Sequence, residues 1–113
     1  MGPRVDLQAT DAKAVREFTH RVRQGLGTEL IALKLFGSKV TGAATPESDI
    51  DVLVVVDDAR AEVRDRVLDI AFDVNLAHDV YISPRVIAQA VLDDPVWRIT
   101  PFLQAVEREG VPL

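Results

Sequence analysis

The chain has 113 residues, of which 48% are hydrophobic and 27% charged, and its formal net charge is −5. This balance favours one compact domain over residues 1–113 and excludes a disordered or membrane-spanning chain, since no apolar run approaches the roughly 18 residues that cross a bilayer. Without cysteine or a signal pattern the chain is expected to be cytoplasmic, and its acidic excess argues against broad nucleic-acid binding.

The first half of the chain predicts a helix followed by two strands. Thr10 and Asp11 are suitable N-cap residues for a helix over 11–26, where apolar residues recur at helical spacing. Residues 30–36 are almost entirely apolar, which predicts a central strand covered on both faces. The next segment is rich in small and turn-forming residues and leads to a second strand, predicted over 49–56.

The second half predicts three helices and one short strand. Asp57 and Asp58 can cap a helix that ends near 75–78, with an apolar face made of Val63, Val67, Ile70 and Val74. A strand over 79–82 follows. A Ser-Pro pair predicts a short helix over 83–92, because proline is favoured in a first turn, and a Thr-Pro pair predicts the last helix. This element order predicts an α+β domain with helices flanking a small mixed β-sheet.

Two carboxylates open the second predicted strand. Because strand side chains alternate, Asp49 and Asp51 project from the same face, about 7 Å apart along the strand. Their mutual repulsion is relieved by a divalent cation, and oxygen ligands suit Mg²⁺. Alternatively, Ser48 and Asp49 only cap the turn and Asp51 is solvated at the strand end, and Asp-x-Asp alone does not decide between these interpretations.

The Gly37-Ser38 pair makes the pattern more specific. A glycine lets backbone N–H groups approach a phosphate, and a hydroxyl can bond its oxygens. Gly-Ser, ten residues and Asp-x-Asp follow one another between two apolar strands. Over residues 30–56 the chain therefore resembles the minimal nucleotidyltransferases of the polymerase-beta-like superfamily, an antitoxin-type family paired with HEPN-domain toxins.

The resemblance implies a nucleotidyltransferase fold with a nucleoside triphosphate and two Mg²⁺ ions at this motif. The candidate nucleotide-binding residues are Gly37, Ser38, Lys39 and Ser48, and the candidate catalytic and metal-binding residues are Asp49, Asp51 and Asp79. Asp79 would be the family's third carboxylate near the acceptor hydroxyl, although that acid often lies nearer to the place of Tyr81, and Asp79 could simply begin a strand. Many relatives have two arginines where this chain has Lys39 and Thr41, and lysine lacks the bidentate fork of arginine.

The resemblance also implies an activity, the transfer of AMP from ATP to an acceptor hydroxyl. The acceptor would be carried by a partner protein such as a HEPN-domain toxin, with this chain as its antitoxin, or the chain would form a homo-oligomer. Two other functions stay open: a catalytically weak nucleotide-binding subunit that neutralises or scaffolds a partner by contact, and an aminoglycoside-type small-molecule nucleotidyltransferase. The short chain disfavours the drug-modifying function, and we also find no drug-binding surface in the sequence.

Overall fold

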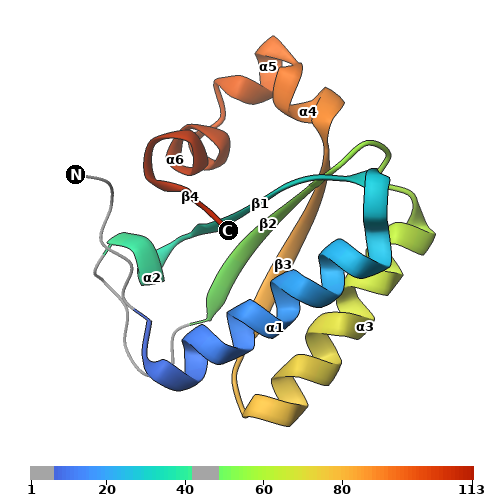
Figure 1. Cartoon of the computed structure of the whole chain (residues 1–113). Coiled ribbons are helices and arrows are strands. Elements are labelled where there is room, and N and C mark those ends of the chain that lie inside the picture. The colour runs from blue at the N-terminus through green and yellow to red at the C-terminus, as the bar shows by residue number, and fades with distance from the viewer. Residues whose placement is uncertain (1–6, 42–48) are drawn as a thin grey trace.

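A computed structural model describes residues 7–41 and 49–113 and shows a four-stranded mixed sheet (Figure 1). The strand order is β3-β2-β1-β4, where β1 is Leu30–Phe36, β2 is Ile50–Val56, β3 is Ile82–Ala88 and β4 is Val111–Pro112. β1 runs antiparallel to β2 and β4, whereas β2 and β3 are parallel. The α+β prediction and the interior position of the first predicted strand are thus confirmed.

Two long helices cover one face of the sheet and enclose the main core. α1 (Ala9–Leu26) and α3 (Ala61–His78) lie side by side across the strands (Figure 1). α1 contributes Phe18 and Val22, which are fully buried against β1 and β2. α3 begins after Arg60, so the prediction that Asp57 and Asp58 cap it was wrong, although its apolar face is the predicted one.

Three short helices near the C-terminus cover the opposite face. They are α4 (Gln89–Asp93), α5 (Pro95–Arg98) and α6 (Pro101–Glu109), which lie across the sheet from α1 and α3 (Figure 1). Leu53 and Val55 of β2 and Val106 of α6 form a second, smaller core there. β2 is therefore buried on both sides beyond its first residues, as its continuous apolar sequence predicts. No helix in the described ranges is both long and apolar enough to cross a membrane.

The third strand lies later in the chain than the sequence suggests. The strand predicted over 79–82 and the helix predicted over 83–92 are both misplaced, because β3 pairs with β2 from Ile50↔Ile82 to Val56↔Ala88 and a helix forms only from Gln89. Pro84 is tolerated since β3 is an edge strand of this sheet, where a missing N–H need not break a ladder. The segment after Pro84 is mostly apolar and long enough to continue the parallel pairing with β2. This pairing outweighs the preference of Ser-Pro for the start of a helix.

Candidate functional site

Asp49 and Asp51 lie at the start of β2, on the sheet face that carries α4, α5 and α6. Ile50 between them is buried in the core beneath α1 and α3, so strand alternation directs the two acids to the other side, in line with Leu53. Asp49 is exposed and Asp51 is half-buried. The two carboxylates therefore open a strand whose remaining residues are inside the protein.

The two acids interact electrostatically. Burial raises the pKa of Asp51 above its ordinary value of 3.8, and the negative charge of Asp49 raises it further, whereas the positive charge of Arg85 lowers it. A carboxylate that is both desolvated and close to a like charge gains from a bound cation. The pair has the electrostatic character that favours a divalent metal.

Gly37 brings the Gly-Ser motif against Asp51. Phe36 is the register partner of Asp51, and the next residue, Gly37, has a φ of 80°. A Cβ at Gly37 would overlap Oδ2 of Asp51 and lie 3.1 Å from its Cγ, so only glycine fits here without movement. The chain then enters α2 (Ser38–Thr41), a short helix that the sequence did not predict. Two motifs separated in sequence thus meet at one point, whereas Ser48 lies outside the described residues.

Lys39 is engaged by another helix. Its side chain is 5% exposed, and its Nζ lies 3.3 Å from Oδ2 of Asp11 on α1. α1 begins after Gln8, so the N-cap role that the sequence predicts for Asp11 is wrong, and its long-range pair with Lys39 has no local signal. The contact ties α2 to α1, and a role for Lys39 at a phosphate stays a prediction.

The neighbouring strand β3 presents no acid at the level of Asp51. The register pairs Asp51 with Ser83 and Leu53 with Arg85. Asp79 ends α3 as its C-cap, in a left-handed conformation with φ 53°, and is not part of β3. Within the described ranges no three His, Cys, Asp or Glu side chains gather to hold a metal, so Asp79 does not complete a three-acid cluster and its catalytic role stays a prediction.

Three side chains form a row across this face, and one of them, Arg85, was missed by the sequence reasoning. The guanidinium carbon of Arg85 lies 4.8 Å from the ring centroid of Phe102 on α6. Phe102 in turn meets Phe36 of β1 edge-to-face, with ring centroids 5.4 Å apart and an angle of 83° between planes. The sequence does show Arg85 as a basic residue inside an apolar run. Its role could be predicted only if that run were recognised as a strand.

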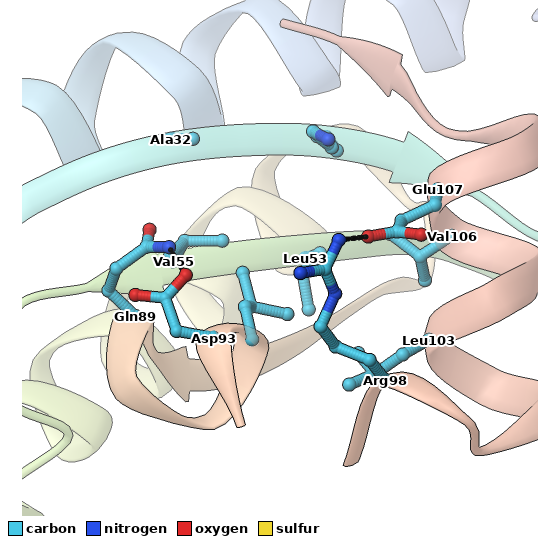
Figure 2. Close-up of a pocket in the computed structure, with 11 residues that line it drawn as sticks. Ala32, Leu53, Val55, Gln89, Asp93, Arg98, Leu103, Val106 and Glu107 are labelled. Atoms are coloured by element: carbon cyan, nitrogen blue, oxygen red, sulfur yellow. Dashed lines mark hydrogen bonds and ion pairs between the residues drawn. The ribbon is translucent and has the colours of Figure 1, made fainter. Parts of the chain in front are cut away.

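A separate cavity of about 250 Å³ lies further along the same face, over Leu53 and Val55 (Figure 2). Its rim is polar: Gln89 donates to Asp93 at 3.0 Å, and Arg98 reaches toward Glu107 at 3.7 Å. Neither Asp49 nor Asp51 lines this cavity. It therefore shares β2 with the Asp-x-Asp motif without being part of the motif's site.

Both motifs lie within the part of the chain that matches a known family. Residues 15–96 match the family model described as nucleotidyltransferase domain, which is more than half of the chain. The chain belongs to this family. The expected minimal nucleotidyltransferase character is confirmed, and the protein is a nucleotidyltransferase.

Individual relatives agree with this family. The chain is 30% identical to the Methanocaldococcus jannaschii protein named "Putative protein adenylyltransferase MJ0141" over 98 residues, which cover 86% of this chain and 92% of that protein. It is similar to the spectinomycin adenyltransferase AAD(9) of Enterococcus faecialis, solved with ATP and spectinomycin, at a TM-score of 0.56 and 25% identity. That match covers 72% of this nucleotidyltransferase but only 35% of the spectinomycin enzyme.

Two solved toxin-antitoxin structures share the fold. One is a toxin-antitoxin with AMP-PNP, matched at a TM-score of 0.53 and 22% identity over 84% of this chain and 68% of that one. The other is a mutant of the toxin-antitoxin MntA-HpeT, matched at a TM-score of 0.52 and 20% identity over 94% of this chain and 72% of that one. At these identities the likeness establishes the architecture of the nucleotidyltransferase.

Proposed function

We propose that this nucleotidyltransferase transfers AMP from ATP to a hydroxyl group of a partner protein, with Mg²⁺ bound at Asp49 and Asp51. The observation that carries the proposal is the close approach of Gly37 to Asp51. It brings the Gly-Ser motif and the Asp-x-Asp motif together. The archaeal relative named as a protein adenylyltransferase supports both the nucleotide and the class of acceptor.

The residues at the site fit a magnesium ion. Mg²⁺ is usually held by one or two carboxylates and completed by water and phosphate oxygens, so Asp49 and Asp51 are a sufficient protein contribution. When bound, the metal would offset negative charge on the phosphates and on the departing pyrophosphate. We include two ions in the proposal, with Asp79 as the candidate third acid.

The chain's own groups would hold the nucleotide and orient the acceptor. Backbone N–H groups after Gly37, at Ser38 and Lys39, would face the phosphates, because no side chain at position 37 blocks the approach. The acceptor oxygen would then attack the α-phosphorus as the bond to pyrophosphate breaks. The hydroxyl proton would leave to water or to Asp79, the candidate third acid, and not to a carboxylate that holds the metal.

A protein partner is proposed on two grounds. Two structures described as toxin-antitoxin share this fold, which supports a toxin as the partner. That this toxin is of the HEPN type, is the acceptor and lies in the cytoplasm is part of the proposal and rests on the sequence resemblance. The outer face of α3 also exposes Leu68, Phe72 and Leu76 at four-residue spacing, with 51%, 64% and 71% of each residue accessible. An exposed apolar stripe of this kind is typical of a contact surface. A homo-oligomer through the same helix is the alternative.

A second candidate function is a nucleotide-binding subunit that neutralises its partner by contact. The observation that favours it is the pairing of Asp51 with Ser83, because β3 offers no acid there to assist the acceptor hydroxyl. A drug-modifying role has less support, since this chain spans only 35% of the spectinomycin enzyme.

The decisive experiment measures transfer of label from α-³²P-ATP with MgCl₂, with and without the product of an adjacent gene. Label on protein that disappears in Asp49→Asn and Asp51→Asn, but persists in Asp57→Asn just past the far end of the same strand, is the expected result. All three variants remove one carboxylate charge, so only the position differs. Binding of Mg-ATP without any transfer would reject the enzymatic proposal and support neutralisation by contact.

A further inference from the structure

The basic residue of the Gly-Ser segment is committed to another contact. Lys39 is buried and engaged with Asp11 of α1. A triphosphate carries several negative charges, and proteins usually meet them with arginine or lysine as well as metal. Because Lys39 is engaged with Asp11, binding of the phosphates would require another basic residue near Asp51.

Arg85 lies close enough to the Asp-x-Asp motif to be this basic residue. It pairs in register with Leu53 and so lies on the β3 strand next to the one that carries Asp51. The contact with Phe102 shows that its side chain lies on the face with α6, which is also the face of Asp51. Ser83 is the register partner of Asp51, so Arg85 lies two residues further along β3, on the face that it shares with Asp51.

The guanidinium of Arg85 is held in place by an aromatic ring. It stacks over the ring of Phe102, and that ring is fixed in turn by its edge-to-face contact with Phe36. Among the residues that the structure describes, none forms a hydrogen bond or ion pair with Arg85. An exposed arginine that is positioned by aromatic stacking and has its whole donor fork available is suited to bidentate binding of an anion.

We propose that Arg85 binds a phosphate group of the nucleotide and that Phe102 is its positioning residue. This inference rests on the proposed function, because it assigns to Arg85 the substrate of the same site. A merely structural role would instead have Arg85 cover Phe102 and hold α6 on the sheet.

The test compares two ligands that differ only in their phosphates. Calorimetry on the wild type and the variants measures the binding of two ligands in separate titrations. One is α,β-methylene-ATP with Mg²⁺, which cannot transfer AMP, and the other is adenosine. We expect Arg85→Gln to weaken binding of the ATP analogue by about ten-fold or more, the effect of losing one charge-assisted hydrogen bond, and to leave adenosine binding unchanged. Arg85→Lys and Phe102→Leu should give smaller losses, since each keeps the charge but loses the fork or its support.

The control is Arg16→Gln, which removes the same charge from an exposed position on α1 and should change neither ligand. Equal weakening of both ligands by Arg85→Gln, or unchanged binding of the ATP analogue, would overturn the assignment of Arg85. If Arg85→Gln weakens only the binding of the ATP analogue, as expected, but the wild type transfers no label, only the proposed transfer reaction is rejected. Failure of the wild type to bind the analogue at all would overturn both.

Discussion

The carboxylate of Asp51 occupies the space into which a side chain at Gly37 would project. The two residues lie on antiparallel neighbours, and Gly37 follows directly after Phe36, the register partner of Asp51. The glycine also has a positive φ of 80°, so it serves both the turn into α2 and the close approach to the acid. This contact fixes where the end of β1 lies relative to Asp51 and the proposed metal site.

Gly37→Ala should lower stability and abolish binding of Mg-ATP. The left-handed backbone costs a non-glycine residue about 1–2 kcal/mol, and the new Cβ would also displace the carboxylate of Asp51. Thermal unfolding and calorimetry with Mg-ATP measure the two effects separately.

Gly27→Ala is the matched control for this variant. Gly27 also has a positive φ, of 55°, but a Cβ there would meet no atom within 4 Å. It should lose stability through the backbone alone and bind Mg-ATP like the wild type. Equal nucleotide binding by both alanine variants would show that the approach of Gly37 to Asp51 is not needed at the site.

The sequence could predict the elements with strong periodicity and the motifs at strand ends. The helix before β1, the strands β1 and β2 and the apolar face of α3 follow from local patterns, so they were predicted near their observed bounds. β3 was misplaced because its burial comes from pairing with β2, a non-local interaction that Ser83-Pro84 obscures in the sequence. Arg85 could not be assigned for the same reason, since its relation to Asp51 exists only once β3 is paired.

Lys39→Met should reduce the free energy of unfolding by about 1–3 kcal/mol, because it leaves the half-buried Asp11 carboxylate without the ammonium that faces it. Urea denaturation measures this loss. Asp11→Asn combined with Lys39→Met should recover part of it, since no charge then remains at the contact. A variant of Lys39 that keeps full stability but loses Mg-ATP affinity would show that the lysine acts on phosphate and not on α1.

Asp51→Asn should make the protein more stable at neutral pH. Burial and Asp49 raise the folded-state pKa of Asp51 above 3.8, so its contribution to stability is present below that pH and is lost as the pH rises through the raised value. Asparagine removes this loss, and the advantage should shrink toward zero below about pH 3.8. Melting temperatures between about pH 3 and 7, with Asp57→Asn as the charge-matched control, test the sign. A wild type more stable than Asp51→Asn at neutral pH would contradict it.

Asp79 can be tested for catalysis and for backbone conformation by two different substitutions. Asp79 ends α3 in the left-handed conformation, which glycine adopts more readily, so Asp79→Gly should stabilise the fold by up to about 1 kcal/mol. Asp79→Asn keeps a residue that tolerates this conformation and removes only the charge. If Asp79 acts only as a helix cap, both variants transfer label at the wild-type rate. If it is the third carboxylate, both lose transfer, and Asp79→Gly does so while its melting temperature rises, which separates a catalytic defect from an unfolded protein.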